Sequence, residues 1–154
     1  MHPDNTALLL NLGLASIMVA VTVLVHFWGL IGLVRIMGRT GQRLRAHDNT
    51  VGQAALLVVV VFGIVGLHTI EIWLYAVVYL GLGALGSLEE AVYFSTVTFV
   101  TLGFGDIVLN KAWRLLSAIE AANGVILAAW STAFLIAVTA RLRALEHDWL
   151  KPRD

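Results

Sequence analysis

Three stretches of this chain are long enough to cross a lipid bilayer and contain almost no charge. They comprise residues 7–34, 51–88 and 115–140. The fixed charges inside them are Glu71 in the second stretch and Glu120 in the third. A hydrocarbon core of about 30 Å requires about 20 helical residues, so each stretch can span it as a helix. Since 59% of the residues are hydrophobic and only 13% are charged, we predict an all-α integral membrane protein with three transmembrane helices.

The basic residues predict how these helices are oriented. No Lys or Arg precedes the first stretch, and its apolar run exceeds the ~7–15 residues of a signal peptide core, so we expect it to be retained. Basic residues follow the first and third stretches: Arg35, Arg39, Arg43, Arg45, Arg141, Arg143, Lys151 and Arg153. The positive-inside rule then assigns the first connection and the C-terminus to the cytoplasm, and the N-terminus and residues 81–113 to the outside. We expect a protein of the bacterial inner (plasma) membrane whose basic clusters require no nucleic acid partner.

A nonapeptide between the second and third stretches carries the strongest functional signal. Residues 98–106 read Thr-Phe-Val-Thr-Leu-Gly-Phe-Gly-Asp. Gly103 and Gly105 can adopt positive φ at low cost, which lets successive carbonyl groups point the same way. The preceding residues 88–100 are predicted to form a short helix, with Ser87 as its N-cap and Glu90 at capping-box spacing. Because this helix is too short to cross, we expect it to enter the membrane halfway and return through an extended strand.

The nonapeptide resembles the selectivity filter of tetrameric potassium channels, and residues 52–142 resemble the pore module of the bacterial two-helix members of that family. Its Phe-containing form is similar to filters of two-pore-domain and some voltage-gated relatives. The resemblance implies that K⁺ is bound by the Thr101 hydroxyl and by the backbone oxygens of Thr101, Leu102, Gly103 and Phe104. It also implies that Gly105 completes the filter. The residues that it implies as support for the filter are Tyr93, Thr98, Val100 and Asp106. Since the motif occurs once in the chain, a closed filter requires a homotetramer.

The resemblance also divides the chain into parts. Residues 1–50 hold an additional N-terminal helix and its basic connection, 51–140 the pore domain, and 141–154 a short cytoplasmic tail that either extends the last helix or frays. The pore domain is expected to contain an outer helix (52–80), a pore helix (88–100), the filter (101–106) and an inner helix (113–140). The additional helix packs either beside the second span or against a neighbouring subunit.

Two positions depart from the family pattern. Val100 stands where the family usually has Thr, which removes one hydroxyl behind the filter. Val97 stands where well-known bacterial members have a Glu that pairs with the Asp after the filter. We therefore expect Asp106 to have another partner, for which Tyr93 is the candidate.

Polar residues inside the spans are candidate functional groups, because burying them in a bilayer is costly. Helical spacing predicts a cluster behind the filter formed by His68, Glu71, Glu120 and Asn123. Such a cluster acts either as a proton sensor or as a static hydrogen-bonded lock. His26, beside Phe27 and Trp28, is interpreted as a packing or lipid-facing residue, and no spacing in the sequence indicates a structural metal site.

Small residues of the third stretch are expected to shape the pore. Gly124 is either a gating hinge or a point of close helix packing. Below it, Ala128, Ala129 and Thr132 are expected to line a water-filled cavity.

These features together favour passive, potassium-selective conduction. The alternatives are a monovalent cation channel with weak selectivity for K⁺ over Na⁺, and a non-conducting membrane scaffold or subunit. An enzyme is not expected, since no Ser-His-Asp or paired-carboxylate arrangement lies at a water-exposed site. We expect no catalytic residue and no cofactor, with K⁺ and membrane lipid as the partners of the homotetramer. The sequence contains no cysteine, which excludes disulfides and thiolate metal ligands.

Overall fold

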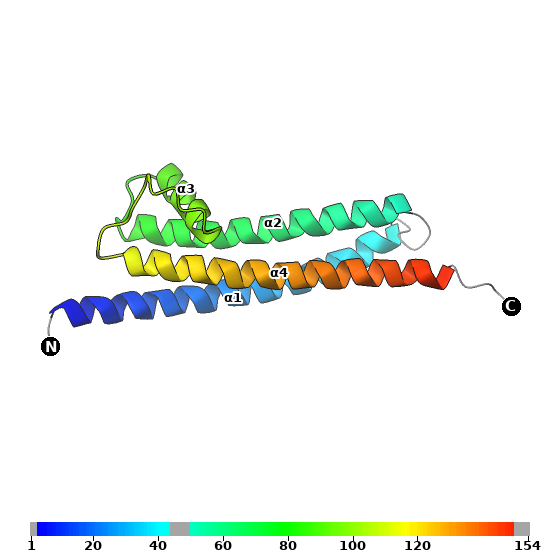
Figure 1. Cartoon of the computed structure of the whole chain (residues 1–154), viewed down its shortest axis with the longest axis horizontal. Helices are drawn as coiled ribbons and strands as arrows, with labels where there is room; N and C mark the ends of the chain where they lie inside the picture. The colour runs from blue at the N-terminus through cyan, green and yellow to red at the C-terminus, as the bar shows by residue number, and fades with distance from the viewer. Residues whose placement is uncertain (1–2, 44–49, 150–154) are drawn as a thin grey trace. The chain divides into compact units, whose positions relative to one another are not determined.

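The computed structural model describes the backbone of residues 3–43 and 50–149 and the side chains of residues 8–41 and 50–142. This part of the chain contains four helices, labelled in Figure 1: α1 (Pro3–Arg43), α2 (Thr50–Gly81), α3 (Leu88–Phe99) and α4 (Arg114–Trp149). No strand occurs among these residues, so the predicted all-α class is confirmed.

Three of the helices are long and apolar enough to cross a membrane. Their spanning segments are Leu8–Gly41, Thr50–Gly81 and Arg114–Leu142. Both α1 and α4 extend beyond the apolar stretches that predicted them. In α4 the helix continues past the predicted end at residue 140 to Trp149, because the next proline of the sequence is Pro152. The three predicted spans are present, and the chain is an integral membrane protein.

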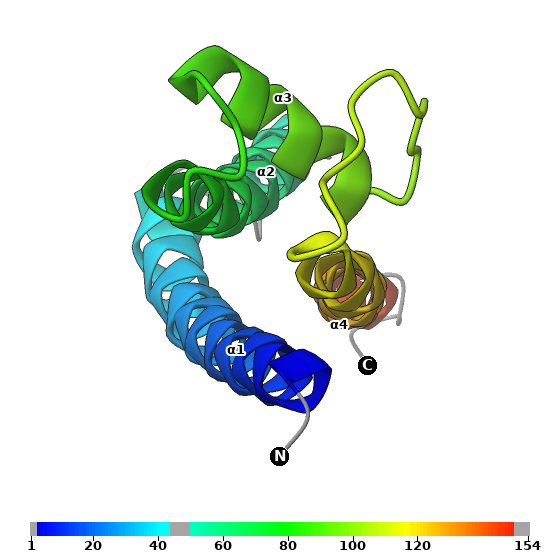
Figure 2. The ribbon, with the colours of Figure 1, turned by 90° about the vertical axis from the view of Figure 1, so that its left-hand side faces the viewer.

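The chain divides into two compact units. Unit 1 combines Met1–His26 with His68–Ala128, and unit 2 combines Phe27–Leu67 with Ala129–Asp154. The helix α3 and the connection that leads to α4 belong to unit 1, whereas α1, α2 and α4 each contribute to both units. Figure 2 views unit 1 end-on, with α3 lying next to α2 and the connection after α3 leading to the start of α4.

Unit 1 has a core that includes two tyrosines of α2. Tyr75 and Tyr79 are fully buried, and the Tyr79 ring meets the Phe94 ring of α3 edge-on at a centroid distance of 5.3 Å. Met18 of α1 and Leu116 of α4 pack into the same cluster. All four helices therefore contribute to the core beneath the connection that contains the filter-like sequence.

Unit 2 has an apolar core in which α1 and α2 approach closely. A Cβ atom on Gly29 would collide with the Leu67 side chain, and one on Gly63 would collide with Leu33. Glycines on both helices thus permit a separation that larger residues would prevent. The remaining buried members of this core are Leu56, Val60, Val138 and Leu142. Within unit 2 the additional N-terminal helix lies beside the second span, which is one of the two arrangements expected for it.

The N-terminus of α3 is capped at the predicted residue. Ser87 has an extended backbone, and its Oγ accepts a hydrogen bond from the Glu90 N–H at 3.2 Å. The Glu90 carboxylate accepts from the Gly86 N–H at 3.0 Å, one residue earlier than in a standard capping box. The helix ends at Phe99, one residue before its predicted end, because Val100 leaves the helical conformation at φ −85° and ψ 5°. These two ends determine where the following segment begins.

Candidate functional site

Residues 101–106 form neither helix nor strand, and their backbone alternates in conformation. The φ angle is positive at Thr101 (59°), Gly103 (49°) and Gly105 (78°), while the residues between them have negative φ. Alternation of this kind turns successive carbonyl groups toward one side of the chain. The positive φ angles expected for the two glycines are present, whereas that of Thr101 was not predicted.

Backbone hydrogen bonds attach the other side of this segment to the end of α3. The N–H groups of Leu102 and Gly103 both donate to the Val97 carbonyl, at 2.8 and 3.1 Å, and the Thr101 N–H donates to the Thr98 carbonyl at 2.9 Å. In a trans peptide group the N–H and the C=O point in opposite directions. The carbonyl oxygens of these three peptide groups belong to Val100, Thr101 and Leu102. They therefore point away from α3, as a row of acceptors.

Thr101 holds a conformation that its side chain disfavours. A non-glycine residue in the left-handed region costs roughly 1–2 kcal/mol, because its Cβ approaches the following carbonyl oxygen. Such strain persists only where surrounding contacts impose it. Here the hydrogen bonds from Thr101 and its two successors to the end of α3 impose it. Hydrogen bonds to α3, rather than the conformational preference of Thr101, therefore determine the backbone conformation of this segment.

At the other end of the segment, Asp106 is hydrogen bonded to α3. The Tyr93 hydroxyl donates to Asp106 Oδ2 at 2.7 Å, and the Ile107 N–H donates to Asp106 Oδ1 at 3.1 Å. The Tyr93 bond lowers the pKa of Asp106 below its ordinary value, because it stabilises the carboxylate. The same bond to the carboxylate raises the pKa of Tyr93. The predicted contact between Tyr93 and Asp106 is therefore confirmed.

A buried carboxylate on α4 joins α3 to α2. Glu120 Oε1 accepts a hydrogen bond from Ser95 at 2.5 Å, and Glu120 Oε2 accepts one from Tyr79 at 2.5 Å. The Ser95 hydroxyl also lies 2.9 Å from the Ile72 carbonyl oxygen of α2. The side chains of Ser95, Tyr79 and Glu120 are fully buried. This Glu120 cluster (Glu120, Ser95 and Tyr79) fixes the rotation of α3 against its two neighbouring helices.

Polar contacts also bind α1 to the rest of unit 1. The Asn123 amide of α4 donates to the Thr22 hydroxyl at 2.8 Å and to the Tyr75 hydroxyl at 3.3 Å. Near the start of α4, the Asn11 amide donates to the Ala112 carbonyl at 2.5 Å. The additional helix therefore supports the same unit that contains the filter-like segment.

A third group of buried polar side chains joins α1 to α2. His26 Nδ1 and His68 Nδ1 each lie 2.8 Å from a different oxygen of Glu71. The His26 and Glu71 side chains are fully buried, while that of His68 is 19% exposed. The interpretation of His26 as a packing or lipid-facing residue is wrong, because its ring contacts the carboxylate of Glu71. Glu71 stands 45 residues away, on another helix. We call these three residues the His–Glu–His triad.

The four polar residues expected to form one cluster thus lie in different groups. These groups are His68 and Glu71 with His26, Glu120 with Ser95 and Tyr79, and Asn123 with Thr22 and Tyr75. The sequence pattern identified members of each group and the pair His68 and Glu71, but not the partners that come from other helices. Ser95 was detectable as a polar residue on the helical face that also carries Ala91 and Phe94, both buried.

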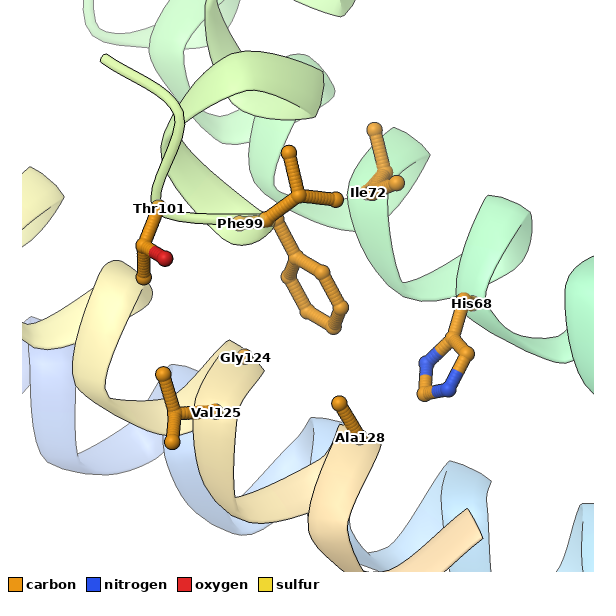
Figure 3. Close-up of a pocket in the computed structure, with 8 residues that line it drawn as sticks. His68, Ile72, Phe99, Thr101, Gly124, Val125 and Ala128 are labelled. Atoms are coloured by element: carbon orange, nitrogen blue, oxygen red, sulfur yellow. The ribbon is translucent and has the colours of Figure 1, made fainter. Parts of the chain in front are cut away.

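A pocket of about 340 Å³ lies between the end of α3 and the helices α2 and α4. Figure 3 shows Phe99, Thr101, His68, Gly124 and Ala128 around it. A Cβ atom on Gly124 would collide with the Phe99 carbonyl, which supports the close-packing interpretation of this glycine. Ala128 lines this pocket. The water-filled cavity expected for Ala128, Ala129 and Thr132 stays a prediction.

Comparison with known families identifies the pore part of the chain. Residues 54–141, more than half of the sequence, match the family described as Ion channel (Ion_trans_2). The match covers all of α3, the filter-like segment and most of α2 and α4, while α1 lies outside it. Neither the curated proteins nor the solved structures gave a match. Proteins of this family are channels rather than enzymes, as expected. With its two flanking spans, short helix and row of backbone acceptors, the chain belongs to the ion channel family.

Proposed function

We propose that this chain is the subunit of a potassium-selective channel that conducts K⁺ passively. The observation that carries the proposal is the pair of hydrogen bonds from Leu102 and Gly103 to the Val97 carbonyl. These bonds turn the carbonyl groups of the same peptide units, those of Thr101 and Leu102, to the other side of the segment, where converging oxygens would replace the hydration shell of an ion. The proposed K⁺ ligands are the backbone oxygens of Thr101, Leu102, Gly103 and Phe104 and the Thr101 hydroxyl.

Four copies of the chain would close this filter, because each contributes a single filter segment. Apolar side chains in and beside the segment are largely exposed in the isolated chain: Val100, Leu102, Phe104 and Val108 are 56, 55, 66 and 76% exposed. Neighbouring copies would cover such a surface. In the proposed homotetramer α3 is the re-entrant pore helix, and the partial negative charge at its C-terminal end favours a cation on the axis.

The proposed orientation has the N-terminus outside and the C-terminus in the cytoplasm of the bacterial inner membrane. Three spans put the two termini on opposite sides. The basic residues of the first connection and of the chain after residue 140 favour the cytoplasmic side for both regions. Asp106 and Tyr93 then lie at the outer end of the filter.

A weakly selective monovalent cation channel is the second candidate. Val100 supplies no hydroxyl where the resembling filters usually have one, and its side chain lines the pocket beside Thr101. Fewer polar contacts at the base of the filter would leave the carbonyl positions less fixed. Looser carbonyls discriminate less well between K⁺ and Na⁺ when selectivity depends on their spacing.

Flux measurements in liposomes with opposed K⁺ and Na⁺ gradients test both candidates. The variants to compare are Gly103→Ala in the filter and Gly83→Ala in the connection between α2 and α3. Both glycines have positive φ, 49° and 62°, and both have open space for a Cβ, so the two substitutions are matched in backbone strain. We expect K⁺-selective flux in the unmodified chain and in Gly83→Ala, and its loss in Gly103→Ala.

The other outcomes separate the candidates. Equal K⁺ and Na⁺ flux through the unmodified chain would favour the weakly selective channel. An absence of flux at every voltage and pH would favour a non-conducting scaffold or subunit.

A further inference from the structure

The His–Glu–His triad brings together three side chains that commonly bind transition metals. His26 comes from α1, and His68 and Glu71 stand one turn apart on α2. One ligand atom of each side chain lies within 4.8 Å of those of the other two. Two histidines and one carboxylate are a ligand set that zinc sites use, with a fourth position left for water or another ligand.

The distances are close to those of a bound ion. Each imidazole Nδ1 lies 2.8 Å from a Glu71 oxygen, which is the length of a hydrogen bond. In a tetrahedral zinc site with bonds of about 2.0–2.1 Å, neighbouring ligand atoms lie about 3.3 Å apart. To admit the ion, each N–O separation would lengthen by roughly half an ångström. The two imidazoles, which contact different oxygens of Glu71, would also turn toward one point. The metal would take the place of the hydrogen bond in each contact, and each neutral imidazole would then carry its single proton on Nε2.

The surroundings of the triad favour a cation. Glu71 and His26 are fully buried in segments that cross the membrane, where a lone carboxylate is costly. As metal ligands, two imidazoles in their neutral form and one carboxylate would carry a net charge of −1, which a divalent ion would more than compensate. Imidazole ligands select zinc and similar transition metals over Mg²⁺ and Ca²⁺, which prefer oxygen. Hard cations are therefore disfavoured here.

An access route to the triad exists on one side. His68 is partly exposed and lines the pocket that also contains Phe99, Thr101 and Gly124. Figure 3 shows the His68 ring at the edge of this pocket. The centroid of the His68 ring lies 5.6 Å from that of the Phe99 ring. His68 is therefore next to the last residue of α3. An ion entering through the pocket would reach the triad at its exposed member.

We propose that His26, His68 and Glu71 form an intramembrane binding site for a divalent transition metal ion, with zinc as the ion that the ligand set fits best. The bound ion links α1 to α2 directly beside the end of α3. The additional N-terminal helix, which lies outside the matched family region, thereby supplies one ligand of the site. The inference does not depend on ion conduction, since binding is measured without flux.

The test uses the full chain in lipid nanodiscs and Co²⁺ as a spectroscopic substitute for zinc. Tetrahedral Co²⁺ bound through nitrogen and oxygen gives visible absorption bands, and Zn²⁺ should abolish them by competition. We expect saturable binding of one Co²⁺ ion per chain. His68→Gln is the first variant, since its partly exposed position tolerates change, and it should lose the bands; His26→Gln and Glu71→Gln should lose them as well.

A matched control replaces the other three histidines of the sequence, His2, His47 and His147, by Gln. This triple variant should keep the bands. Chromatography of each variant checks that the assembled state is intact, and Zn²⁺ should raise the thermal unfolding temperature of the unmodified chain but not that of His68→Gln. Absence of saturable binding in the unmodified chain would overturn the proposal. Bands that survive in His68→Gln and disappear in the triple variant would overturn it too, since they would come from the other histidines.

Discussion

The interiors of the two units contain different kinds of contact. In unit 1, polar side chains connect the helices; among the described residues the buried ones are Asn11, Thr22, His26, Glu71, Ser95, Glu120 and Asn123. In the described part of unit 2 the interior is apolar, with Leu33, Leu56, Val60, Val138 and Leu142 beside the buried Ser131. Lipid tails are as apolar as leucine, so apolar contacts in a membrane distinguish between helix arrangements only by how well the side chains fit. A hydrogen bond requires one particular partner. Polar contacts are thus concentrated in the unit whose backbone must be held in one position.

The Glu120 cluster illustrates this use of polar contacts. The Ser95 hydroxyl lies within hydrogen-bond distance of a backbone carbonyl of α2 and of the Glu120 carboxyl group of α4, and its single proton is shared between these two acceptors. A small rotation of α3 would break both bonds and move the Val97 carbonyl that receives the N–H groups of Leu102 and Gly103. Ser95 therefore couples the filter-like segment to the interior of unit 1, alongside the contact between the Tyr79 and Phe94 rings.

The largest effect is expected from removing the Glu120 carboxylate. Glu120→Ala leaves the Tyr79 hydroxyl buried without its acceptor, at a cost of about 1–3 kcal/mol, while the Ser95 hydroxyl keeps only the Ile72 carbonyl. We expect a marked fall in the thermal stability of the assembled protein together with loss of K⁺ selectivity. Glu120→Gln retains one acceptor and gains a donor. Its thermal stability should lie between those of the unmodified chain and Glu120→Ala.

The matched change in unit 2 is Val60→Ala, since Val60 is also fully buried. It should lower the stability measured by thermal unfolding and leave the K⁺/Na⁺ flux ratio unchanged. An equal loss of selectivity in Val60→Ala and Glu120→Ala would remove the distinction between the units.

The next largest effect is expected at a glycine. In Gly124→Ala the new methyl group meets the backbone carbonyl of Phe99, which cannot move without displacing the base of the filter-like segment. In Gly63→Ala the methyl group meets the side chain of Leu33, which can change rotamer. Overpacking costs about 1–3 kcal/mol, and we expect Gly124→Ala to lie at the upper end and to reduce flux.

Single-channel or liposome flux and thermal unfolding distinguish the two interpretations of Gly124. A close-packing role predicts that Gly124→Ala loses both stability and flux, with a smaller stability loss and normal flux in Gly63→Ala. Normal stability of Gly124→Ala with altered opening would instead indicate a hinge.

The features that the sequence predicted depend on neighbouring residues. The three spans follow from length and composition, the cap of α3 from Ser87, and the two positive φ angles from Gly103 and Gly105. The contact between Tyr93 and Asp106 was also predicted, because Val97 cannot supply the carboxylate that pairs with this Asp in related channels, and Asp106 then needs another partner nearby. Such features require no knowledge of how distant helices are rotated.

The features that were missed depend on that rotation. Ser95 and Glu120 stand 25 residues apart, and His26 and Glu71 stand 45 apart, on different helices. A helical pattern gives the face on which a residue lies but not the partner that the face meets. In apolar segments such as these, the hydrophobic pattern gives little information about facing even within one helix. The positive φ of Thr101 was missed for another reason, since it is imposed by bonds to α3 against the preference of threonine.

A smaller effect is expected from the contact between α1 and α4. Thr22 and Asn123 are hydrogen bonded in the interior of unit 1. A double-mutant cycle with Thr22→Val and Asn123→Ala should give a coupling free energy of about 0.6 kcal/mol, the average for hydrogen bonds between membrane helices, and not above ~1.7 kcal/mol. Ser16→Ala provides the matched control, because the Ser16 hydroxyl bonds to the Leu12 carbonyl of its own helix. It should show no coupling with Asn123→Ala, and coupling of equal size in both cycles would exclude a specific link.

The smallest effect at neutral pH is expected from Tyr93→Phe, because Asp106 stays ionised there in both proteins. The Tyr93 hydroxyl lowers the pKa of Asp106, so its contribution is present above the ordinary pKa of Asp and is lost as the pH falls through the lowered value. Without the hydroxyl the pKa of Asp106 rises toward its ordinary value, and acid-induced loss of stability or flux should begin at a higher pH. A pH titration of thermal stability measures this shift. Asp106→Asn should remove this acid-dependent component, and identical acid profiles for the unmodified chain and Tyr93→Phe would mean that the bond has no part in holding the outer end of the segment.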